Sequence, residues 1–201
     1  MKTNTLPIHI VDDDASVREA LLFLLQSLGY EANAWPDGKA FLEGVDIHLG
    51  GVAIIDIRMP HLNGQELFQH LIEAESDMAV IVLTGHGDVP MAVNMLKQGV
   101  VDFLQKPVAL VQMDEALERA LLQARQNREQ RRLQRLYQGL SPRERQVTEL
   151  VLQGKTNKAI AEALNIAVRT VEVQRAGAMQ KMQADSLPAF VQAVSAACTE
   201  K

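Results

Sequence analysis

Acidic side chains and one lysine stand where short apolar segments of the sequence end. Asp56 follows the apolar run 51–55, the acidic triplet 12–14 follows residues 8–11, and Lys106 follows residues 101–105. If these runs are buried strands, each charged group is placed at the edge where its strand leaves the sheet. Several carboxylates and one ammonium group at such an edge predict a pocket for Mg²⁺ and a phosphoryl group.

The chemistry of such a pocket assigns a role to each group. Asp56 would accept the phosphoryl group, and Asp12 and Asp13 would hold the divalent cation beside it. Lys106 would stabilise the phosphoryl oxygens from the other side, and the Thr84 hydroxyl would move towards the bound phosphate. The alternative is an acid-rich set of loops with a lysine ion pair, but gathering three carboxylates without a cation is costly.

The first half of the sequence alternates short apolar runs with longer helical patterns. The expected strands are residues 7–12, 30–35, 51–56, 79–84 and 102–105. The expected helices are residues 15–28, 37–45, 64–75 and 88–98, with another beginning near residue 108. This order predicts a doubly wound α/β fold, a (βα)5 parallel five-stranded sheet with helices on both faces. Ligands of such sheets bind beyond the carboxyl ends of the strands.

The second half is wholly helical in pattern. Residues 110–137 form one expected helix, whose polar stretch 125–135 favours a solvated connector over a nucleic-acid-binding arm or a short coiled coil. Four further helices are expected at residues 142–153, 157–164, 168–182 and from 187 onward. A short helix, a tight turn and a second helix with basic residues are typical of a helix-turn-helix. We therefore expect a first domain at 1–125, a helical linker at 126–138 and a small all-α domain at 139–201.

Charge and composition agree with two domains that have different partners. The chain has 201 residues, is 47% hydrophobic and has a net charge of −5. Residues 1–108 carry 15 acidic and 6 basic side chains, whereas residues 109–201 carry 10 and 14. The acidic half suits a metal and a phosphoryl group, and the basic half suits nucleic acid. One cysteine, no apolar run long enough to span a membrane and no secretion signal favour a cytoplasmic protein.

Five motifs together resemble the receiver domain of bacterial two-component response regulators, with a FixJ-like segment after Thr84. They are Val11-Asp-Asp-Asp14, Asp56-Ile-Arg-Met-Pro60, Asn63-Gly64, Thr84-Gly-His-Gly-Asp-Val-Pro-Met-Ala-Val93 and Asp102-Phe-Leu-Gln-Lys-Pro107. The resemblance implies that a sensor histidine kinase phosphorylates Asp56. It adds the backbone carbonyl of Arg58 to the Mg²⁺ ligands Asp12, Asp13 and Asp56. It also makes Phe103 an aromatic switch that follows Thr84.

The basic half resembles the LuxR-type four-helix DNA-binding domain. Its motifs are Leu140-Ser-Pro-Arg-Glu-Arg145, Gly154-Lys-Thr-Asn-Lys-Ala-Ile-Ala161, Arg169-Thr-Val-Glu-Val-Gln-Arg175 and Lys181-Met182. The resemblance implies that the third helix reads double-stranded DNA and that the fourth supports dimerisation. Val173 and Ala176 would face base edges, and the other expected contacts to phosphates or bases are Lys158, Arg169, Thr170, Arg175 and Lys181.

Four residues depart from the pattern of that DNA-binding family. Gln174 replaces a histidine, Gly177 stands where arginine is common, Ala178 replaces a larger apolar residue, and Ala167 lacks a capping hydroxyl. A glycine inside a helix costs about 1 kcal/mol relative to alanine. We therefore expect weak DNA binding or a strong dependence on dimerisation.

Three functions compete for this sequence. The first is a transcription regulator that forms a homodimer on phosphorylation, with RNA polymerase left open as a further partner. The second is a phosphatase with an aspartate nucleophile, whose usual pattern places the nucleophile after the first strand and lacks a DNA-binding half. The third is a receiver that acts through protein contacts without DNA. Asp12-Asp13-Asp14 at the first strand–helix turn excludes a glycine-rich dinucleotide site. We expect the first, a regulator rather than an enzyme.

Overall fold

The chain divides into two compact units, which we describe separately. The computed structural model describes residues 6–85 and 89–198. Unit 1 spans Met1–Arg128 and unit 2 spans Glu129–Lys201. The division lies inside the stretch 126–138 that the sequence marks as a linker. No helix among the described residues is long and apolar enough to cross a membrane.

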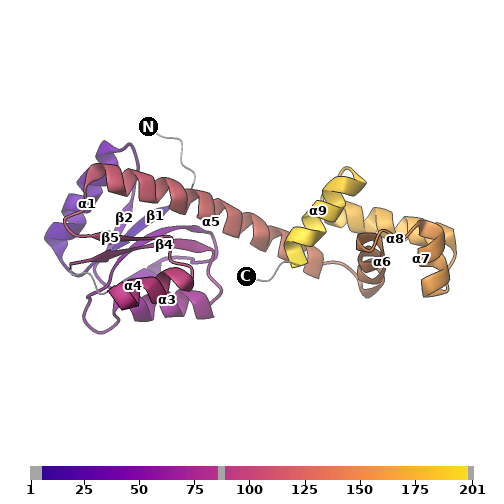
Figure 1. Cartoon of the computed structure of the whole chain (residues 1–201), viewed down its shortest axis with the longest axis horizontal. Coiled ribbons are helices and arrows are strands. Elements are labelled where there is room, and N and C mark those ends of the chain that lie inside the picture. The colour runs from indigo at the N-terminus through magenta and orange to yellow at the C-terminus, as the bar shows by residue number, and fades with distance from the viewer. Residues whose placement is uncertain (1–5, 86–88, 199–201) are drawn as a thin grey trace. The chain divides into compact units, whose positions relative to one another are not determined.

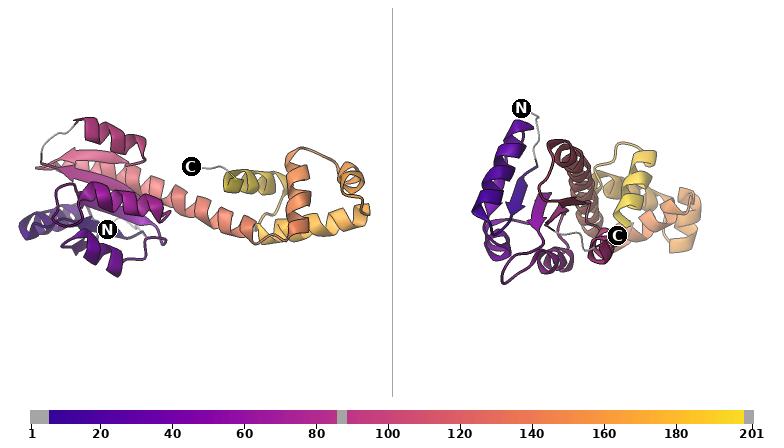
Figure 2. Two further views of the ribbon diagram at one scale, coloured as in Figure 1. Left: turned by 90° about the horizontal axis from the view of Figure 1, so that it is seen from below. Right: turned by 60° about the vertical axis from the view of Figure 1, so that its left-hand side comes forward.

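Unit 1 is a parallel five-stranded sheet in the order β2-β1-β3-β4-β5 (Figure 1). The strands are β1 (Ile8–Val11), β2 (Asn33–Trp35), β3 (Gly51–Asp56), β4 (Met78–Thr84) and β5 (Asp102–Gln105). The helices are α1 (Ala15–Ser27), α2 (Gly38–Gly44), α3 (Gly64–Glu73), α4 (Val89–Lys97) and α5 (Leu110–Gln138). Helices α1 and α5 cover one face, and α2, α3 and α4 cover the other (Figure 2). The predicted doubly wound α/β fold is confirmed.

The central strands are buried on both faces because helices cover the sheet on each side. Every residue of β3 and β4 is buried, as expected for a parallel sheet. Successive side chains alternate between the faces. In β1, Ile10 packs against the α1–α5 layer and Val11 packs against the α2–α4 layer.

The edge strand β2 is shorter than the predicted 30–35. The Tyr30 backbone N–H donates to the Leu25 carbonyl at 2.9 Å, which closes the end of α1. Gly29, with φ at 84°, makes the turn that this bond requires. Residues 29–32 therefore connect the helix to the strand, and pairing with β1 begins at Asn33.

Unit 2 contains the helices α6 (Pro142–Leu152), α7 (Asn157–Leu164), α8 (Val168–Lys181) and α9 (Leu187–Cys198). Their apolar faces form one core around Val147, Ile160 and Phe190. As the sequence predicts, Ser141 and Glu144 close a capping box at the start of α6. Ala167 gives α8 no side-chain cap.

The last turns of α5 pack against the core of unit 2. Leu136 and Tyr137 pack against the core of that unit, and Arg132 Nη1 donates to Gln183 Oε1 at 2.6 Å. The last turns of α5 are therefore attached to the helical domain rather than surrounded by solvent on all sides.

His9 gives unit 1 a predicted dependence on pH. It is buried in β1, its Nδ1 accepts the indole N–H of Trp35 at 3.1 Å, and its buried Nε2 has no hydrogen-bond partner among the described residues. Burial lowers the pKa of His9 from its ordinary value of 6.5. Protonation is therefore less favourable in the folded than in the unfolded chain. The stabilisation is complete above pH 6.5 and decreases below it, by up to about 1.4 kcal/mol per pH unit.

Denaturant unfolding followed by the fluorescence of Trp35, the single tryptophan, measures this effect between pH 7 and pH 5. His9→Gln keeps an acceptor for the indole N–H but does not titrate, so its stability should decrease less with falling pH. Equal decreases in the two proteins would show that His9 is not responsible.

Candidate functional site

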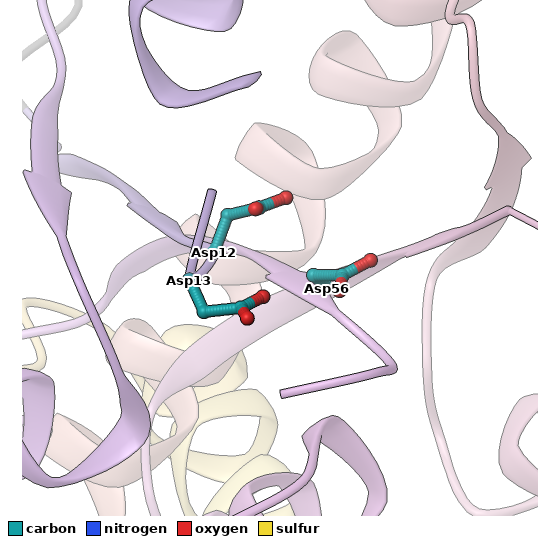
Figure 3. A group of neighbouring side chains, drawn as sticks. All are labelled: Asp12, Asp13 and Asp56. Atoms are coloured by element: carbon teal, nitrogen blue, oxygen red, sulfur yellow. The ribbon is translucent and has the colours of Figure 1, made fainter. Parts of the chain in front are cut away.

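The predicted acidic and basic groups meet at the carboxyl edge of the sheet. Asp12 directly follows β1, Asp56 is the last residue of β3, and Lys106 directly follows β5. One carboxylate oxygen from each of Asp12, Asp13 and Asp56 lies within 4.8 Å of the other two. Figure 3 shows these three side chains gathered from the ends of two neighbouring strands. The parallel register of β1 and β3 thus joins residues that are more than forty positions apart in the sequence.

Lys106 links two of the three carboxylates. Its Nζ lies 2.5 Å from Asp12 Oδ2 and 2.8 Å from Asp56 Oδ1. Burial raises the pKa of Asp56, and the hydrogen bond from Lys106 only partly offsets this effect. Burial would lower the pKa of Lys106, but its hydrogen bonds to Asp12 and Asp56 outweigh burial and raise it. Lys106 is therefore held as a cation beside the carboxylate of Asp56.

The donor set fits Mg²⁺. Three carboxylates face one ammonium group, so the cluster keeps an excess of negative charge that a divalent cation would balance. Carboxylate oxygens are the ligands that Mg²⁺ prefers. The backbone N–H of Arg58 donates to Asp56 Oδ2 at 3.1 Å, which places the Arg58 backbone beside the cluster. The carboxylate oxygens of the cluster are therefore suited to the Mg²⁺ that the sequence predicts.

Gly64 allows the segment after β3 to approach the acceptor. A Cβ atom at Gly64 would lie 2.3 Å from the carbonyl oxygen of Asp56. The Gly64 N–H donates to the Ile57 carbonyl at 3.1 Å, and Asn63 caps α3 in a capping box with Glu66. The pair Asn63-Gly64 therefore fixes the start of α3 against the end of β3.

A pocket of about 570 Å³ opens at the segment that follows Asp56. Its walls come from the segment after β3, from α3, from the end of β4 and from α4. The lining residues are Ile57, Arg58, Met59, Asn63, Gln65, Thr84 and Met91. Thr84 lines this pocket, whereas Asp12, Asp13, Asp56 and Lys106 are not among its lining residues.

The two predicted switch residues lie on neighbouring strands. Thr84 is buried at the end of β4, and its carbonyl accepts the Lys106 backbone N–H at 2.8 Å. Phe103 on β5 is half-buried and packs against the α2–α4 layer. Its backbone N–H donates to Asp102 Oδ1 at 2.8 Å, and Asp102 forms an ion pair with Arg119. His86, Gly87 and Asp88 of the motif after Thr84 lie outside the described residues.

The predicted DNA contacts differ in how free their side chains are. Six of the seven are exposed on α7 and α8: Lys158, Arg169, Thr170, Val173, Ala176 and Lys181. Arg175 is half-buried and donates to Asn157 Oδ1 at 3.1 Å. Lys181 forms an ion pair with buried Glu144 at 2.7 Å. Sequence reasoning missed both partners, because a contact between different helices leaves no signal in the spacing of residues along one of them.

Comparison with known proteins places both units in families. Residues 8–118 match the response regulator receiver domain, and residues 127–194 match the luxR family of bacterial regulatory proteins. The chain therefore belongs to the response regulators that join a receiver domain to a LuxR-family DNA-binding domain.

Individual relatives cover nearly the whole chain. The tetrathionate response regulatory protein TtrR of Salmonella typhimurium is 50% identical, over 92% of this chain and 89% of its own length. The sequence at Trp35 and at residues 137–140, 165–168 and 182–184 also predicts a resemblance to this regulator. The transcriptional regulatory protein FixJ of Azorhizobium caulinodans is 45% identical over 93% and 90%. These relatives are named as regulators, which argues against the alternative of a phosphatase with an aspartate nucleophile.

Solved structures agree with this membership. The response regulator StyR is 39% identical and aligns with a TM-score of 0.70 over 96% of this chain and 99% of its own. Full-length FixJ from B. japonicum is 38% identical and aligns with a TM-score of 0.56 over 99% and 100%. The chain is thus a response regulator of transcription in both sequence and fold.

Proposed function

We propose that Asp56 accepts a phosphoryl group from a sensor histidine kinase and that this modification switches DNA binding by unit 2. The observation that carries the proposal is the meeting of Asp12, Asp13 and Asp56 within 4.8 Å, with Lys106 2.8 Å from the acceptor. This arrangement resembles the site expected from the motifs. The two proposed partners, a sensor histidine kinase and DNA, agree with the cytoplasmic location that we expect from the sequence.

In the transfer step the Asp56 carboxylate attacks phosphorus. A new O–P bond forms while the P–N bond to the donor imidazole breaks, and the imidazole leaves with the electron pair. Mg²⁺ held by Asp12, Asp13, Asp56 and the Arg58 carbonyl would neutralise charge on the phosphoryl oxygens. Lys106 stabilises the same charge from the opposite side. Gly64 keeps the loop close enough for the Arg58 backbone to take part.

The phosphoryl group then changes the surface of the receiver. In our proposal the Thr84 hydroxyl moves towards the phosphoryl oxygens, and the half-buried Phe103 turns inward beside it. The altered face of α4, β5 and α5 forms a homodimer. Dimerisation brings two DNA-binding units together, which raises their effective concentration at paired half-sites. RNA polymerase would be a further partner at the promoter.

The recognition helix in this proposal is α8. Val173 and Ala176 are exposed and would face base edges in the major groove. Lys158, Arg169 and Thr170 are exposed and would contact phosphates or bases. Arg175 would act from its position beside Asn157, and Lys181 lies in the last turn of α8.

Binding to a DNA duplex selected from a randomised library tests the proposed function. With Mg²⁺, acetyl phosphate should raise the affinity of the wild-type protein by at least about 100-fold through dimerisation. Sedimentation should show the dimer at the same protein concentration. Asp56→Asn should show neither change. An equal response of the variant would refute the role of Asp56, and no DNA binding by either protein would favour signalling through protein contacts.

Mg²⁺ itself should stabilise unit 1. At a free concentration 100 times its dissociation constant, a ligand that binds only the folded state stabilises by about 2.7 kcal/mol. We expect thermal unfolding of unit 1 to shift upward with added Mg²⁺, and the shift to be much smaller for Asp12→Asn. The matched control is Asp46→Asn, because Asp46 caps its own loop through the His48 N–H and lies outside the cluster. A shift that survives in Asp12→Asn would argue against this metal site.

A further inference from the structure

Glu144 is a buried carboxylate that serves two helices. Its Oε2 accepts the Ser141 backbone N–H at 2.7 Å, which closes the capping box of α6. The same oxygen accepts Lys181 Nζ at 2.7 Å, from the last turn of α8. The side chain of Glu144 is 9% exposed, against 46% for Lys181. The hydrogen bond from Lys181, more than that from Ser141, keeps the pKa of Glu144 below its ordinary value.

Gly177 lies on the same face of α8 as Lys181, since residues four positions apart in a helix are neighbours. A Cβ atom at Gly177 would lie 2.8 Å from Glu144 Oε1. Any larger residue would therefore displace the Glu144 carboxylate group, which is the end of a flexible side chain. The glycine that departs from the family pattern thus lies where α8 comes close to the Glu144 carboxylate.

The neighbours of Glu144 hold other segments in the same way. Arg143 Nη2 donates to the Leu164 carbonyl at the end of α7, at 3.1 Å. Arg145 Nη2 donates to the Gln138 carbonyl at the end of α5, at 3.3 Å. Successive helix residues point about 100° apart, so three consecutive side chains reach three different segments. The first turn of α6 therefore positions both helices of the helix-turn-helix.

We propose that Glu144, Lys181 and Gly177 form a clamp that sets the position of α8 on α6, and that Lys181 is a positioning residue rather than a DNA contact. The Glu144–Lys181 clamp, as we call it, gives Lys181 a different role from the DNA contact that the sequence predicts. The predicted effect of the clamp on DNA binding rests on the proposed function, whereas its predicted effect on amide hydrogen exchange does not.

A double-variant experiment distinguishes the two roles of Lys181. Lys181→Gln leaves the buried Glu144 carboxylate without its cation and should weaken binding to the selected duplex by about tenfold or more. Glu144→Gln/Lys181→Gln replaces the ion pair by two neutral amides that can hydrogen-bond, and should restore most of the affinity. If Lys181 contacts a phosphate, the double variant stays weak and the slope of log affinity on log salt decreases by about 0.9. That result would overturn the proposal.

Lys158→Gln is the matched control, because Lys158 is an exposed lysine on α7 and a proposed phosphate contact. Its loss should lower the salt slope, and adding Glu144→Gln should not restore binding. Rescue of both lysine variants alike would mean that Glu144→Gln improves binding generally, and this would also overturn the clamp.

Amide hydrogen exchange of the full-length protein without DNA gives the second readout. Lys181→Gln should speed exchange in residues 168–181, and the Glu144→Gln/Lys181→Gln double variant should return it towards the wild-type rate. Exchange in α8 that is unchanged by Lys181→Gln would refute the clamp. If exchange behaves as expected but the wild-type protein binds no DNA, the clamp stands and the proposed function fails.

Discussion

Replacing Lys106 with methionine is expected to slow phosphorylation of Asp56 by about 10²–10³-fold, the usual effect of removing one preorganised charge stabiliser. The reason is geometric, since Lys106 Nζ lies 2.8 Å from Asp56 Oδ1 and is the cation that the structure places beside the acceptor. Methionine keeps the length of the side chain but not its charge. Phosphoryl incorporation from acetyl phosphate over time measures the rate.

The same variant should not weaken binding of Mg²⁺. Lys106 also lies 2.5 Å from Asp12 Oδ2, so its removal frees both carboxylates for the metal. Lys39→Met is the control for loss of a lysine, because Lys39 is exposed and pairs only loosely with Glu43 at 3.8 Å. A Lys106→Met protein that is phosphorylated at the wild-type rate would contradict the assigned role.

Replacing Gly64 with alanine is expected to disrupt both stability and phosphorylation. The new Cβ would lie 2.3 Å from the Asp56 carbonyl oxygen and 2.9 Å from Ile57 Cα. Both neighbours are backbone atoms, so either α3 or the end of β3 must move. Forced overpacking of this kind costs about 1–3 kcal/mol, and it displaces the Asp56 carboxylate from Lys106. The unfolding temperature and the phosphorylation rate should both decrease.

Gly85→Ala is the matched control for this stability effect. A Cβ at Gly85 meets no atom of the residues that the structure describes within 4 Å, so the same chemical change is made without a collision with them. We expect its unfolding temperature to stay close to that of the wild-type protein. If Gly64→Ala and Gly85→Ala unfold alike, the close approach at Gly64 has no energetic consequence.

The site in unit 1 could be predicted from the sequence because strand ends are easy to locate. The short runs before Asp12, Asp56 and Lys106 define three of the strands, and a parallel sheet brings the ends of its strands to one edge. The helix bounds also follow from local signals, such as the capping box of Ser141 and Glu144. In these cases the information lies within a few residues along the chain.

The contacts between helices could not be predicted in this way. Lys181 reads as a surface lysine near a helix end, and only the packing of α8 on α6 brings it to Glu144. From the sequence, Gly177 is only a residue that destabilises a helix. The structure adds that a Cβ atom at this position would lie close to the Glu144 carboxylate. The predicted strand 30–35 is longer than β2 for a similar reason. The N–H of Tyr30 donates to a carbonyl at the end of α1 instead of pairing in the sheet.

Intact-mass measurement after incubation with acetyl phosphate and Mg²⁺ tests the central role of Asp56 most directly. We predict that the wild-type chain gains the mass of one phosphoryl group and that Asp56→Asn gains none. A wild-type chain of unchanged mass, or an equal gain by the variant, would contradict phosphorylation of Asp56 as the event that controls this protein.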